Sequence, residues 1–225
     1  MLKQIIAIWK GDKFMKKIVE SFGEMISDGE KVFRDAWEAV AGDIGVKDIR
    51  QQIYDRDRRI NDREREIRRM LAEHLSINPR QDTAGSLAMM SLVKDAERIG
   101  DYAKNIFELA FIMGKDIREM KYIDRLTALK DRIADRFPPL KKSYVESDEE
   151  LAREVLNEYQ DIKLECGKLM DELFVDELPT REAICTVLMI RSLKRINSHM
   201  SNIASGIIYP LDQIDFVREK GGILD

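Results

Sequence analysis

The chain has 225 residues, of which 44% are hydrophobic and 36% are charged, so it can bury a core and keep a charged surface. Its 38 basic and 42 acidic residues give a net charge of -4, which favours neither nucleic acid nor an anionic membrane as a partner. The two cysteines show neither CxxC spacing nor a disulfide framework, which fits a reducing cytoplasm. Only 12 glycines and 5 prolines among abundant Glu, Lys, Arg, Leu, Ile and Ala predict an all-α fold.

The N-terminal segment, residues 1–12, alternates apolar residues with lysines. Its apolar run is too short for a signal peptide or a membrane span. A segment of this kind can lie on a membrane surface. We expect instead a first helical turn that docks on the body of the protein.

Helix-breaking residues divide the rest of the chain into six helical blocks. A residue before proline avoids helical angles, so Asn78-Pro79 ends the second block and Pro138-Pro139 is expected to end the fourth. Ser147 and Glu150 form a capping-box pattern that opens the fifth block. The expected helices are 13–41, 46–75, 83–113, 116–137, 148–176 and 180–208.

The second of these helices carries an apolar seam with a polar row beside it. Val46, Ile53, Ile60 and Ile67 recur every seven residues and form the seam. The polar row consists of Asp57, Asn61 and Glu64, which follow Ile53 at helical spacing and lie at the edge of the seam. A polar row at the edge of a core needs partners on the next helix.

An internal repeat appears when residue 97 is aligned with residue 194. The segment DAERIGDYAKNI (95–106) then faces SLKRINSHMSNI (192–203), with four identical positions, and Pro79 and Pro179 precede the two segments at similar distances. Two three-helix units packed into one elongated bundle are the simplest architecture. We assign residues 13–114 to the first unit and residues 115–225 to the second.

The segment ERIGDYAKNI, together with the preceding Asp95, resembles the signature of PhoU proteins. In that family a D-L-E-R-I-G-D-x-x-x-N-I pattern lies in the third helix of each of two repeats. Upstream, DRDRRINDREREI (55–67) is similar to the second helix of that family. The resemblance implies two tandem antiparallel three-helix bundles related by a pseudo-twofold repeat. It also implies a cytoplasmic regulator of phosphate uptake that contacts a phosphate transporter, a sensor kinase or both. A homodimer and a peripheral membrane contact through the transporter fit the same picture.

The same resemblance implies a metal site. Some PhoU proteins bind iron or zinc through E/D-x-x-x-D motifs, which here become Glu97 and Asp101, with Asp57 contributed by the second helix. Asn61 stands where the family has a second acid and is at best a weak ligand. Carboxylate oxygens suit iron and manganese, and zinc is an alternative. Structural ion pairs between these carboxylates and neighbouring Lys or Arg side chains are the other interpretation.

The second repeat departs from the acidic pattern. Lys194 replaces the glutamate and Ser198 replaces the aspartate, so we expect one metal site at most. His199 aligns with Tyr102, and both a surface contact and ligation stay open for it. Mid-helix Gly100 costs roughly 1 kcal/mol relative to alanine, which indicates either close helix packing or room for a ligand.

The sequence gives little support for catalysis. The sequence lacks a phosphate-binding loop, a nucleophile elbow and an H-E-x-x-H helix. The residues three before His74 and His199 are Leu71 and Ile196, so the Glu-x-x-His pairs of a di-iron oxidase are missing. We expect no enzyme and no organic cofactor. Two further hypotheses are a metal-carboxylate protein that senses or buffers its metal, and a ligand-free helical adaptor.

Overall fold

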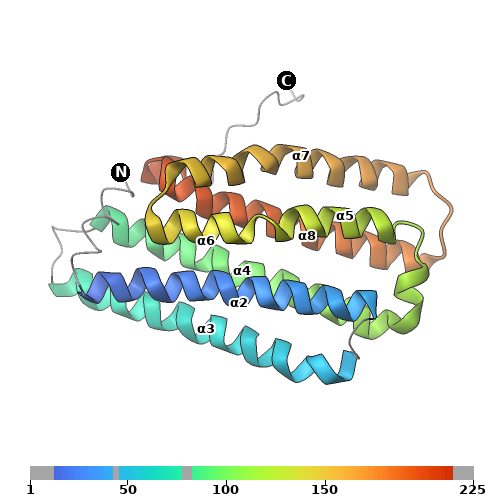
Figure 1. Cartoon of the computed structure of the whole chain (residues 1–225), viewed down its shortest axis with the longest axis horizontal. Coiled ribbons are helices and arrows are strands. Elements are labelled where there is room, and N and C mark those ends of the chain that lie inside the picture. The colour runs from blue at the N-terminus through green and yellow to red at the C-terminus, as the bar shows by residue number, and fades with distance from the viewer. Residues whose placement is uncertain (1–12, 43–45, 78–82, 215–225) are drawn as a thin grey trace.

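A computed structural model describes residues 13–42, 46–77 and 83–214, and long antiparallel helices dominate these ranges (Figure 1). The first unit consists of α2 (Lys13–Ala41), α3 (Val46–Ile77) and α4 (Thr83–Met113). A 3-10 helix, η1 (Gly114–Glu119), leads into the second unit. That unit contains α5 (Ile123–Ala134), α6 (Phe137–Glu146), α7 (Glu149–Phe174) and α8 (Thr180–Ile208), and the short η2 (Leu211–Gln213) follows. The expected docking of residues 1–12 lies outside the described residues.

The first helix of the second unit is broken, and α5 and α6 together take the place that α2 has in the first unit (Figure 1). This arrangement confirms the expected pair of three-helix bundles. The expected helix 116–137 was wrong, because Pro138 and Pro139 lie in the first turn of α6 and do not end a helix. Proline fits the first turn of a helix, where its missing N–H would have no partner in any case.

The start of α7 also differs from the prediction by one residue. Ser147 ends α6 with a φ of 60°, in the left-handed region. Asp148 is the residue that caps α7, because its Oδ1 accepts the backbone N–H groups of Glu150 at 2.9 Å and Leu151 at 3.2 Å. Aspartate is among the best N-cap residues. The capping box predicted at Ser147 was therefore wrong, and the helix boundary nearly right.

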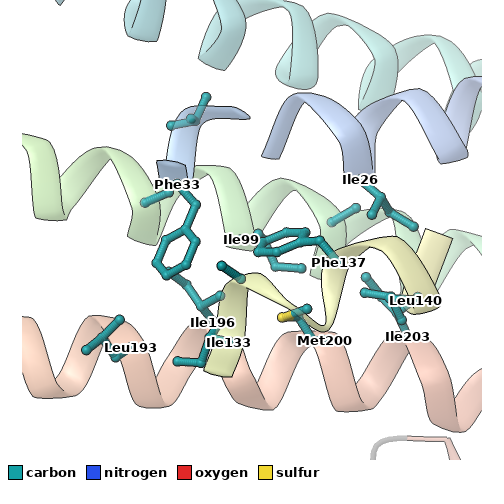
Figure 2. Close-up of a cluster of buried hydrophobic side chains, with 14 of the residues drawn as sticks. Ile26, Phe33, Ile99, Ile133, Phe137, Leu140, Leu193, Ile196, Met200 and Ile203 are labelled. Carbon is teal, nitrogen blue, oxygen red and sulfur yellow. The ribbon is translucent and has the colours of Figure 1, made fainter. Parts of the chain in front are cut away.

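The predicted seam of α3 is confirmed, since Ile53, Ile60 and Ile67 are at most 1% exposed. The side chain of Val46 lies outside the described set. The core continues from the first unit into the second, as Figure 2 shows for Ile26 and Phe33 of α2 beside Phe137 and Ile196. Burial of such side chains is worth about 1.5–3 kcal/mol each. One continuous core therefore joins the two units.

Two helix pairs make most of the contact between the units: α4 packs against α8, and α2 packs against α6. The helices α4 and α8 run antiparallel (Figure 1). Their backbones come close at Gly206, where an added Cβ would lie 2.6 Å from Leu92 Cδ1. Within the first unit, a Cβ on Gly100 would lie 2.9 Å from Ile60 Cδ1. The close-packing interpretation of Gly100 is confirmed.

Candidate functional site

The polar row of α3 faces α4, and a lysine joins two of the three residues predicted as metal ligands. Lys104 Nζ donates to both carboxylate oxygens of Asp57 at 2.9 Å. The same Nζ lies 3.5 Å from Asp101 Oδ1, while Asp101 Oδ2 accepts a hydrogen bond from Arg98 Nη1 at 3.0 Å. Lys104 and Asp57 keep 20% and 15% of their side-chain surface exposed. The pair is thus partly shielded from solvent, which strengthens it relative to a surface ion pair.

Glu97 lies one helical turn before Asp101 and has a different environment. Its side chain is 14% exposed, and its Oε2 is 3.5 Å from Arg98 Nε. Burial, followed by the negative charges of Asp101 and Glu64 and a hydrogen bond with Asp101, raises the pKa of Glu97 to about 7. Glu64 itself is paired with Arg68 at 2.8 Å. Glu97 is therefore a carboxyl group that exchanges its proton near neutral pH.

The arrangement does not present these three carboxylates as an open metal site. The Lys104 ammonium lies between Asp57 and Asp101, where a bound cation would have to be. Within the described ranges, no three His, Cys, Asp or Glu side chains are grouped as metal ligands. Asn61 is half-buried in the same row of α3. The geometry fits the ion-pair interpretation, and metal binding by Glu97, Asp101 and Asp57 stays a prediction.

A second polar cluster, which sequence reasoning missed, joins α4 to α8. Asp95 is only 7% exposed, and its Oδ1 lies 2.6 Å from His199 Nδ1 and accepts a hydrogen bond from Asn202 Nδ2 at 3.0 Å. The His199 ring stacks on Tyr102 with centroids 5.7 Å apart. His199 thus contacts the other unit and keeps 17% of its side-chain surface exposed. The alignment of His199 with Tyr102 was the signal that could have predicted this contact. Two equivalent positions of a pseudo-twofold repeat can meet at the axis that relates the repeats.

A buried arginine, also missed, holds the junction between α5 and α6. Arg136 is 4% exposed, and it donates to the side chains of Asn197 and Ser201 and to the carbonyl of Val155. Its Nε has no hydrogen-bond partner among the described residues. Burial lowers the pKa of Arg136 to about 10. Nothing in the local sequence distinguishes this arginine from the many exposed ones.

Two tandem three-helix units that meet through their third helices, each built on a variant of one signature, define a class of duplicated all-α proteins. The sequence matches the PhoU domain over residues 22–110 and again over residues 126–207. The chain therefore belongs to the PhoU family, as its resemblance to the signature implied.

Individual relatives agree with this assignment. The chain is 27% identical over 201 residues to a Pseudomonas putida protein named phosphate-specific transport system accessory protein PhoU homolog, a match that covers 85% of this chain and 76% of the relative. The crystal structure of PhoU from Pseudomonas aeruginosa superposes with a TM-score of 0.77 at 23% identity, covering 89% of this chain and 97% of that one. The phosphate transport system regulatory protein PhoU from Streptococcus pneumoniae gives 0.63 at 18% identity, covering 95% and 100%. The two crystal structures show that the fold is shared.

Among the helices of the described ranges, none combines the length and the apolar content that crossing a membrane would need.

Proposed function

We propose that this protein regulates phosphate transport and phosphate-starvation signalling in the cytoplasm, by contact with a phosphate transporter, a sensor kinase or both. The observation that carries the proposal is the pair of PhoU domains, at 22–110 and 126–207. The name of the Pseudomonas putida relative, an accessory protein of a phosphate-specific transport system, supports the same role. The proposal involves no chemical reaction: the protein acts by binding and by the shape of its helical faces.

Gene deletion tests this proposal. In cells grown with ample phosphate, loss of a negative regulator should raise phosphate uptake and switch on a phosphate-starvation reporter. Both changes should disappear when the wild-type gene is restored. Unchanged uptake and unchanged reporter expression in the deletion strain would contradict the proposed role.

Binding of iron, zinc or manganese by Glu97, Asp101 and Asp57 is a separate part of the proposal. A metal would have to displace the Lys104 ammonium from Asp57, because the two cations compete for the same oxygens. This part of the proposal predicts that metal analysis of untagged protein, purified without chelator, finds metal in the wild type. The variant Lys104→Met should hold more, and the variant Glu97→Gln/Asp101→Asn should hold none.

The same measurements separate the two other hypotheses. A protein whose main task is to sense or buffer metal should bind it stoichiometrically and lose stability when it is removed. A ligand-free helical adaptor should show no metal in any of the three proteins and no change of stability on chelation. The expected homodimer is tested independently by sedimentation equilibrium.

A further inference from the structure

The repeat places two related clusters at the contact between α4 and α8, on either side of the stacked rings of Tyr102 and His199. In the first cluster, Asp95 of α4 reaches His199 and Asn202 of α8. The alignment of the repeats pairs Asp95 with Ser192, His199 with Tyr102, and Asn202 with Asn105. The helices α4 and α8 run antiparallel (Figure 1). The second cluster therefore consists of Ser192, Tyr102 and Asn105, which line one groove.

The first cluster is complete and the second is open. The Asp95 carboxylate fills the first and is buried there. Ser192 is shorter, and its Oγ donates to the carbonyl of Leu188 in its own helix at 2.9 Å, so it does not reach across to α4. A groove of about 260 Å³ lies at this place, lined by Ser192, Tyr102 and Asn105 among others. The groove stands where the first cluster has its carboxylate.

The side chains around the groove can bind such a carboxylate. Asn105 and Arg191 line it and are exposed, and neither makes a side-chain hydrogen bond or ion pair with any residue that the structure describes. A guanidinium binds a carboxylate through paired N–H donors, more strongly than neutral groups do. The acid in the lining, Glu108, accepts a hydrogen bond from Tyr54 Oη at 3.1 Å. Its carboxylate is thereby held toward α3 and away from α8.

The rim of the groove is apolar and open. Ile112 of α4 is 64% exposed, and Leu188 of α8 is 42% exposed. Next to them, Ile184 is 56% exposed. Neighbouring exposed apolar side chains beside a polar contact point are typical of protein–protein contact sites. A large apolar side chain next to the bound carboxylate would cover this rim.

We propose that the groove between α4 and α8 binds an aspartate or glutamate side chain of a partner protein, presented next to a large apolar residue. The partner's carboxylate takes, beside Asn105 and Arg191, the place that Asp95 takes beside Asn202 and His199. This inference deepens the proposed function, on which it rests only for the existence of a protein partner.

Selection from a peptide-display library tests the inference directly, with immobilised full-length protein as the target. The peptides recovered on the wild type should be enriched in Asp or Glu beside Leu, Ile, Phe or Met. Replacing their acid by its amide should weaken binding at least tenfold, measured by fluorescence anisotropy with the labelled peptide. Recovery of purely apolar or basic peptides, or of none, would overturn the proposal.

Variants locate the binding to this groove. Arg191→Ala should weaken binding of the selected peptide about tenfold, which corresponds to the ~1.4 kcal/mol of one charge-assisted contact. Lys94→Ala is the matched control, because Lys94 is exposed and holds the position of Arg191 in the other repeat, beside the filled cluster. It should leave binding unchanged. Ser192→Asp should supply the missing carboxylate from within and block the peptide, with circular dichroism as the check on folding.

The peptide-binding measurements and the gene deletion test the two proposals separately. Equal binding by the wild type and Arg191→Ala would refute the groove as the site, whatever the deletion strain shows. Conversely, a deletion strain without a phosphate phenotype would refute the phosphate role and leave the peptide measurements valid.

Discussion

The tight contact between α4 and α8 at Gly206 predicts that adding one methyl group there destabilises the protein. A Cβ on Gly206 would lie 2.6 Å from Leu92 Cδ1, 3.0 Å from Cδ2 and 3.3 Å from Cγ. Three carbons of one side chain are involved, so rotation of a terminal methyl cannot relieve the overlap. Leu92 is fully buried, so its side chain cannot turn out into solvent to make room.

The magnitude follows from two opposing effects. Overpacking a core costs about 1–3 kcal/mol, while replacing a helical glycine by alanine gains about 0.5–1 kcal/mol. Gly206→Ala should therefore lower the free energy of unfolding by about 1–2 kcal/mol. Gly167 in α7 is the matched control, because nothing lies within 4 Å of its Cβ position. Gly167→Ala should raise the free energy of unfolding by about 0.5–1 kcal/mol.

Urea unfolding followed by far-UV circular dichroism measures both changes, provided that the m-values stay equal. Truncation of Leu92 supplies a second test, because it removes the overlapping atoms. In a Leu92→Ala background, Gly206→Ala should become neutral or stabilising, which a double-mutant cycle would record as coupling. If Gly206→Ala is as stable as the wild type while Gly167→Ala is more stable, the helices α4 and α8 are not held close at this point.

Three further predictions concern buried polar groups. Burial raises the pKa of Glu97 to about 7, so the folded protein binds a proton there more tightly than the unfolded chain does. The free energy of unfolding should therefore decrease as the pH rises from 4.5 to 7. Glu97→Gln should remove this slope in urea unfolding at a series of pH values, and an unchanged slope would contradict the assignment. Arg136→Ala should lower the free energy of unfolding by about 2–4 kcal/mol, because Asn197 and other buried acceptors lose their donor. Thermal unfolding tests this, with Arg132→Ala at an exposed neighbouring position as the control. Asp95→Asn should cost about 1–2 kcal/mol by weakening the contact with the second unit, and equal stability in chemical unfolding would speak against that contact.

The helices were predictable where side-chain burial alone decides the structure. The seven-residue spacing of Ile53, Ile60 and Ile67 requires one buried face, and a helix is the conformation that provides it. The break between α5 and α6 was not predictable in the same way. Pro138 can end one helix or open the next, and the choice depends on tertiary packing around Arg136, whose burial no local pattern reveals.

The candidate site was predictable as a neighbourhood and not as a set of bonds. Helical spacing put Asp57 on the edge of α3 that faces α4, and the structure brings it together with Asp101 through a shared partner. Which cation stands between them was beyond the sequence, because Lys104 is one of several basic side chains within reach. The pairing of Asp95 with His199 depends on the register of α4 against α8, which only long-range packing fixes.

The antiparallel contact between α4 and α8 affects how the sequences of the two units can diverge during evolution. If the units were identical, this contact would be isologous: every residue pair would occur twice, and one substitution would alter both copies at once. Joined in a single chain, the two copies are free to differ, and a loss on one side can be compensated by a gain on the other. Asp95 contacts His199 in one half of the contact, which is closed by this interaction. Ser192 and Asn105 line a groove in the other half, which is open.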